Sequence, residues 1–214
     1  MRLFIKSKIF TIIILFSCFL FSENDVEYWS QYELSKKVSE QLSYMIKPAI
    51  RFNNNLANHY WSDIAIGLDY RINYLTIISS YFRPLYIKTN NNWTTEYRPY
   101  LAISFKKQYN KLYINDRNQL EFLIRNTNNS LRFRNKLTIG KLSIIQNKLG
   151  LNLSDEFFYD FYKKCINMNR IYLDFQFSFF KNPQLGLCMI QQQSLRDGKW
   201  SNTNIFMTSI KYKI

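Results

Sequence analysis

Basic side chains at alternate positions are the most distinctive chemistry in this 214-residue sequence. Arg132, Arg134 and Lys136 form its densest basic stripe, while Leu131 and Phe133 fall on the opposite side of the same segment. Guanidinium groups bind carboxylates and phosphates through paired hydrogen bonds. The stripe can therefore hold an anionic ligand or pair with acidic side chains.

Further charged residues follow the same alternation along the chain. Those expected to share one enclosed surface are Arg51, Asp63, Asp69, Arg71, Glu96, Arg98, Arg117, Glu121, Arg132, Arg134, Lys136, Glu156, Arg170 and Asp174. Charges removed from bulk water need partners, so one interpretation is a network of ion pairs. The other is a surface that binds or conducts anions, because rings of basic side chains select anions in pores.

Catalytic and metal-binding patterns are poorly represented. The single histidine, His59, has Ser62 and Asp63 nearby, but these two side chains fall on opposite faces of a strand. We therefore expect no catalytic residues, and an envelope enzyme that modifies lipid is kept only as an alternative. No His/Cys spacing or Asp-x-Asp loop suggests a metal, and we expect no cofactor.

The elements that position these charges are strands. Period-two alternation predicts strands over 41–52, 60–72, 131–139, 170–179 and at the C-terminus, with weaker ones at 28–35, 75–87, 95–106, 112–125, 148–158 and 185–194. No segment of useful length has the period of a helix. Hydrophobic residues make up 47% of the chain and aromatic residues 18%, which excludes a disordered protein. The sequence predicts an all-β domain.

Strand length favours a membrane barrel over a soluble one. Globular strands usually have about 5–6 residues, whereas about 9–11 residues cross a bilayer at a tilt. Aromatic residues near strand ends resemble interfacial girdles: Tyr28, Trp29, Tyr60, Trp61, Trp93, Phe157, Phe158, Tyr159 and Trp200. The alternative is a secreted soluble sandwich or barrel that binds an apolar ligand, because alternation cannot say which face is inside.

The first 22 residues have the layout of a secretory signal peptide. Arg2, Lys6 and Lys8 precede an uncharged apolar run from Ile9 to Phe21. That run is short for a membrane-spanning helix, which needs about 20 apolar residues. We expect a signal peptide over 1–22 and a barrel domain over 23–214. Removal of the signal peptide lowers the formal net charge from +14 to +11, since three basic residues and no acidic residue are lost.

The eleven segments conflict with a rule of barrel construction. Bacterial single-chain barrels normally have an even number of strands. We therefore expect an antiparallel up-and-down barrel of about 10–12 strands, with 10 or 12 favoured and one segment miscounted. Short breaks are expected at 36–40, 73–74, 107–110 and 181–184, and longer ones at 53–59, 89–93, 126–130, 159–168 and 195–201. This alternation predicts that the last strand runs toward the periplasm, where the short turns lie.

The chain also resembles an uncharacterised outer-membrane-barrel family, domain of unknown function 2490. The resemblance covers most of the mature chain and rests on the order of short motifs: Trp29-Ser-Gln-Tyr32, Arg51-Phe52, Asp63 to Tyr70, Glu96-Tyr-Arg98, Leu131-Arg-Phe-Arg134, Glu156-Phe-Phe158 and Asn169-Arg170. It implies an outer-membrane barrel and supplies no activity or catalytic residue.

These observations converge on an outer-membrane β-barrel of a Gram-negative-type cell. We expect a structural role or a narrow, porin-like passage that favours anions, with outer-membrane lipid and small anions as partners. Nucleic acid is not an expected partner, because the basic residues alternate along many strands and form no single exposed patch.

Overall fold

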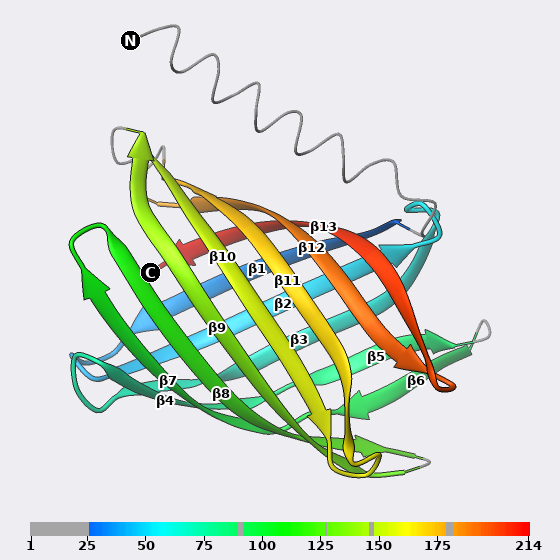
Figure 1. The fold of residues 1–214 in the computed structure, drawn as a ribbon. Helices are drawn as coiled ribbons and strands as arrows, with labels where there is room; N and C mark the ends of the chain where they lie inside the picture. The colour runs from blue at the N-terminus through cyan, green and yellow to red at the C-terminus, as the bar shows by residue number, and fades with distance from the viewer. Residues whose placement is uncertain (1–25, 90–91, 127, 146–147, 179–181) are drawn as a thin grey trace, which may run out of the picture.

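The computed structural model describes residues 26–214 except 90–91, 127, 146–147 and 179–181 (Figure 1). The expected signal peptide lies outside the described residues. No helix in the described part of the chain is long and apolar enough to cross a membrane. The described residues instead form strands that wrap around a closed barrel (Figure 1).

Thirteen strand segments build this barrel. They are β1 (Val26–Lys37), β2 (Leu42–Asn53), β3 (Asn58–Arg71), β4 (Thr76–Phe82), β5 (Pro84–Thr89), β6 (Asn92–Tyr97), β7 (Tyr100–Tyr109), β8 (Leu112–Arg125), β9 (Ser130–Ile145), β10 (Leu149–Asp160), β11 (Cys165–Phe177), β12 (Gln184–Arg196) and β13 (Lys199–Lys213). Each of the eleven segments expected from alternation coincides with one of them or with two consecutive ones.

Two of the barrel strands are each interrupted once. Both β4 and β5 pair with β3, on either side of Arg83, so they act as one strand. In the same way β6 and β7 both pair with β8, on either side of Arg98 and Pro99. Proline cannot donate to a ladder, which is consistent with a break at Pro99. The barrel therefore has eleven strands, within the expected range.

The barrel closes through a parallel pair. Strands β1 and β13 run in the same direction in a ladder from Val26 opposite Asn204 to Ser35 opposite Lys213. All the other strand pairs are antiparallel. The preference for an even number was wrong, because that rule assumes that the first and last strands are antiparallel. No segment was miscounted.

The parallel closure puts the start of β1 and the end of β13 at opposite rims, named here the N-terminal and C-terminal rims. The N-terminal rim carries the connections at 54–57 and 161–164, and the C-terminal rim those at 38–41 and 72–75. The expected long break at 195–201 is a two-residue turn, in which Asp197 and Gly198 both have positive φ. Such turns suit hairpins. The described connections thus do not alternate in length as expected.

The two surfaces of the barrel have opposite character. On β3, Ile64, Ile66 and Leu68 are exposed on the outer face, while Asp63 and Ala65 are buried inside. The same pattern recurs around the barrel, where the buried residues include charged groups and the exposed ones include many Ile, Leu, Tyr and Phe side chains. This is the reverse of a soluble barrel, in which apolar side chains fill the interior.

Candidate functional site

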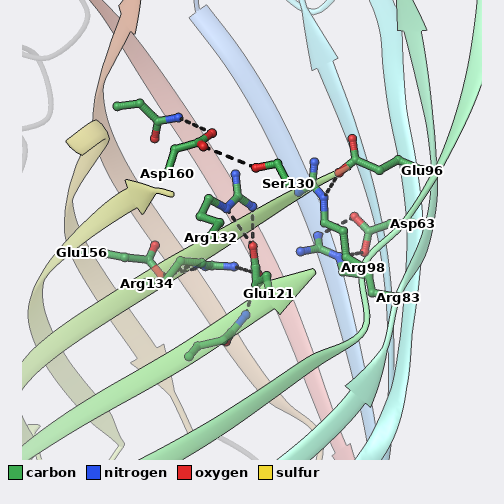
Figure 2. Close-up of polar contacts among 12 residues, drawn as sticks. Asp63, Arg83, Glu96, Arg98, Glu121, Ser130, Arg132, Arg134, Glu156 and Asp160 are labelled. Atoms are coloured by element: carbon green, nitrogen blue, oxygen red, sulfur yellow. Dashed lines mark hydrogen bonds and ion pairs between the residues drawn. The ribbon is translucent and has the colours of Figure 1, made fainter. Parts of the chain in front are cut away.

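Glu121 lies at the centre of the polar interior. Its side chain is 0% exposed, and it accepts hydrogen bonds from Arg132, Arg134 and Gln119 (Figure 2). The Arg132 Nε atom lies 2.9 Å from Oε2, and the Arg134 Nη1 atom 2.5 Å from Oε1. The register explains these contacts, since Glu121 is opposite Arg132 and Gln119 is opposite Arg134 on β8 and β9. A buried carboxylate is thereby matched by two guanidinium groups.

Arg134 also joins this centre to a second carboxylate, Glu156 on β10. Its Nη2 atom lies 2.6 Å from Glu156 Oε1. The Tyr172 hydroxyl donates to the other oxygen of Glu156, and the Arg170 Nη1 atom lies 3.9 Å from it. The guanidinium of Arg134 thus spans two carboxylates on strands either side of its own, which ties β8, β9 and β10 together.

Two further carboxylates are paired on the wall formed by β3 and the interrupted strands. Asp63 accepts two hydrogen bonds from Arg83, at 2.8 and 2.7 Å, and one from the Trp61 indole N–H. Glu96 accepts from Arg98 and Arg125. Arg83 and Arg98 occupy the two strand interruptions, so both breaks place a guanidinium inside the barrel (Figure 2).

Aromatic rings connect these pairs across the interior. Arg51 lies over the rings of Trp29 and Trp61, 3.8 and 4.3 Å from their centroids. Trp29 also faces Arg170, at 4.9 Å, and Trp61 faces Arg98, at 4.9 Å. Stacking of this kind orients arginine while leaving its N–H groups free to donate.

Part of the expected aromatic girdle lies inside the barrel and not at its rims, so that part of the prediction was wrong. Trp29, Trp61 and Phe158 are buried in the interior, where Phe158 packs against arginine side chains. Their positions in the alternation match those of the charged residues, so the period of the strand overrides closeness to its end. Trp93 and Trp200 are exposed.

A cavity of about 440 Å³ occupies the interior beside these residues. Its charged lining is unbalanced, with three acids, Glu27, Asp63 and Glu156, and ten basic residues: Lys47, Arg51, Arg83, Arg98, Arg117, Arg132, Arg134, Lys136, Arg170 and Arg196. Three further acids, Glu33, Glu96 and Glu121, do not line the cavity but form ion pairs with basic residues that do. Even when these three are included, basic groups outnumber acidic ones, so the charged lining of the cavity is net positive.

The structure brings most of the expected charged residues together. Nine line the cavity: Arg51, Asp63, Arg98, Arg117, Arg132, Arg134, Lys136, Glu156 and Arg170. Glu96 and Glu121 are buried beside it, Asp69 accepts a hydrogen bond from Tyr81, and Asp174 accepts one from Asn152. Arg71 differs, because it lies exposed at the end of β3 and lines no part of the cavity.

Four other charged residues also line the cavity: Lys47, which alternation places on the same face of its strand as Arg51, and Glu27, Arg83 and Arg196, which sequence reasoning missed. Arg83 is the instructive case. It continues the buried alternation of Ser79 and Tyr81, so the period-two signal was present in the sequence. The strand expected at 75–87 spans Arg83, but this residue was not assigned to the enclosed face.

His59 lies apart from this interior site. Its Nε2 atom is 2.9 Å from Ser62 Oγ and 3.1 Å from the carbonyl oxygen of Trp61. A carbonyl only accepts, so this geometry puts the proton on Nε2 and prevents that atom from serving as a base toward Ser62. Asp63 cannot orient the ring, since its carboxylate is bound to Arg83 inside the barrel. Among the described residues, no group of His, Cys, Asp or Glu is arranged to hold a metal ion.

Fold and site together define a closed, eleven-stranded β-barrel with a charged interior and an apolar outer face. The family model described as "Protein of unknown function (DUF2490)" matches residues 26–203, and the chain belongs to this family. The expected resemblance is thereby confirmed. No curated protein and no solved structure matches the chain.

Proposed function

We propose that this chain is an outer-membrane β-barrel of a Gram-negative-type cell, exported by a cleaved signal peptide at residues 1–22, and that its lumen is a narrow passage favouring small anions. The outer face supports the membrane setting. Strands of 12 to 16 residues, such as β2 and β9, are long enough to cross a bilayer at a tilt. Their exposed Ile, Leu and aromatic side chains suit contact with lipid.

The excess of basic groups around the cavity carries the anion preference. Ten basic and three acidic residues line it, and rings of basic side chains favour anions in pores. The ion pairs of Glu121, Glu156, Asp63 and Glu96 are buried inside the barrel beside the cavity, which supports a narrow passage. An apolar ligand, as in a lipocalin-like carrier, would meet charged groups here, so the interior does not favour that alternative.

Planar bilayers test the passage directly. With the refolded protein in a KCl gradient, we expect small channels whose reversal potential has the sign of chloride selectivity. A potential of the opposite sign contradicts the anion preference. Silence at all voltages removes the pore and leaves a structural barrel.

The membrane setting has its own test. Mature protein should fractionate with the outer membrane, and its gel mobility should change on heating, as for a closed barrel that resists detergent. Mature protein recovered from the soluble periplasm without detergent would overturn the proposal.

A further inference from the structure

Three basic side chains of the cavity have no carboxylate oxygen of a described residue within the 4.0 Å of an ion pair, although one of them, Lys136, is directly opposite Glu156 in the strand ladder. Of the ten lining cations, six form ion pairs with acidic groups. Arg196 is exposed at the N-terminal rim, where water can solvate it. Arg51, Arg117 and Lys136 lie within the barrel, and no ion pair to a described carboxylate involves them. Cations removed from bulk water without partners are unfavourable.

Aromatic rings contact all three groups and occupy few of their N–H donors. Arg51 stacks on Trp29 and Trp61, and the Lys136 Nζ atom lies 3.4 Å from the centroid of the Tyr172 ring. Arg117 lies near the Tyr100 ring and donates one hydrogen bond, of 3.2 Å, to Gln119. A guanidinium has five N–H donors and an ammonium three. Most of these donors therefore remain available to a guest in the cavity.

The three groups approach the cavity from two walls. Arg117 and Lys136 are directly opposite each other on β8 and β9. Arg51 projects from β2, and Lys47 on the same strand also lines the cavity. Groups that line one cavity from different strands suit a molecule with several anionic groups better than a single monovalent ion. The cavity volume of about 440 Å³ lies in the range of small-molecule sites, roughly 300–1,000 Å³.

We propose that Arg51, Arg117 and Lys136 form a binding site for a small organic or inorganic polyanion, whose phosphate or carboxylate groups take their free N–H donors. This inference rests on the proposed anion-favouring lumen and goes further, because it requires saturable binding as well as passage. Bidentate bonds from the two arginines provide geometric selectivity that a merely positive channel lacks.

The protein contains a reporter for this site. Trp29 and Trp61 are buried against Arg51, whereas Trp93 and Trp200 are exposed on other parts of the barrel. We therefore suggest titrating the full refolded chain in detergent with pyrophosphate and, separately, with citrate, at constant ionic strength in chloride. Tryptophan fluorescence should change saturably with at least one of them. A preference between the two identifies phosphate or carboxylate as the recognised group.

Variants locate the binding. Lys136→Gln and Arg117→Gln leave the contacts of Arg51 with Trp29 and Trp61 intact. Each should weaken binding about tenfold or more, since hydrogen bonds between charged groups are among the strongest. Arg71→Gln is the matched control, because Arg71 lies on the same barrel but outside the cavity. Heat-modifiable mobility on gels checks that each variant is folded.

Several outcomes overturn the inference. The first is a linear, non-saturating response to both polyanions. The second is binding by the Lys136→Gln and Arg117→Gln variants that is as tight as binding by the unchanged protein. The third is a loss of binding in Arg71→Gln as large as the loss in those two variants. Failure here is distinguishable from failure of the proposed function. A folded barrel that conducts chloride but does not bind polyanions disproves the site alone, whereas saturable binding without conductance disproves the passage alone.

Discussion

At the scale of single residues, the interior is organised by carboxylates that each serve more than one donor. Glu121 and Glu156 share Arg134, and both are almost completely buried. Alternation in the sequence identified both acids and the arginine as members of one surface. It could not identify which acid pairs with which base, because pairing depends on the register between strands and the sequence of one strand does not contain that register.

Replacing Glu121 by Gln tests the importance of this centre. The substitution keeps the shape but removes the negative charge between Arg132 and Arg134. Loss of one partner from a buried ion pair leaves an uncompensated charge, and we expect unfolding to become easier by about 3 kcal/mol. Urea unfolding of the refolded barrel in detergent measures this. Glu40→Gln is the control, since Glu40 pairs with Lys37 on the exposed surface, and its stability should be unchanged.

At the scale of elements, the strands were largely predictable and their interruptions were not. The segments expected from alternation match the observed strands because one face of each is apolar and the other polar along most of its length. The breaks at Arg83 and at Arg98–Pro99 arise where β3 and β8 each exchange one partner segment for another. Such an exchange is a property of neighbouring strands: Pro84 and Pro99 mark positions where a ladder is weakened, but they do not indicate which strand each segment pairs with.

Gly67 on β3 offers a test of strand packing. A Cβ atom there would overlap the backbone carbonyl oxygen of Ser80 and the ring of Tyr81 on the neighbouring strand. Tyr81 in turn stacks on Tyr100, with ring centroids 5.0 Å apart. We expect Gly67→Ala to destabilise the barrel by about 1–3 kcal/mol, as overpacking typically does.

Thermal unfolding followed by circular dichroism measures the effect of this change. Gly150→Ala is a matched control, because the nearest atom to its added Cβ lies 3.6 Å away, at ordinary contact distance. If both alanine variants melt at the same temperature, the close approach at Gly67 is not a determinant of stability.

At the scale of the whole molecule, the barrel has charged side chains inside and apolar ones outside, and it closes through the parallel pair of β1 and β13. The sequence showed two chemically distinct faces but not which one is enclosed. Enclosure follows from closure of the sheet, which requires contact between β1 and β13, about 180 residues apart, as in the hydrogen bond between Tyr28 and Thr208. Alternation predicts eleven segments, which is the observed number of barrel strands. The even-number rule is wrong for this barrel because its first and last strands are parallel.

Ile66→Lys tests the outward-facing surface. Ile66 is 49% exposed in the middle of β3. In a bilayer, a lysine near the midplane of a barrel costs about 2–4 kcal/mol. Membrane assembly should therefore fall markedly, as measured by heat-modifiable protein in the outer-membrane fraction. Leu56→Lys in the connection at 54–57 should assemble normally. Equal assembly of both variants would contradict contact between β3 and lipid.

The parallel seam also restricts how the chain can be rearranged. In a barrel with an even number of strands, both chain ends reach the same rim and a short peptide can join them. Here the start of β1 and the end of β13 lie at opposite rims, because Lys213 is opposite Ser35, nine residues along β1 from Val26. At about 3.3 Å per residue, a joining peptide must extend for roughly 30 Å. A circular permutant of this barrel therefore needs a linker that either passes through the arginine-lined cavity or crosses the apolar outer face.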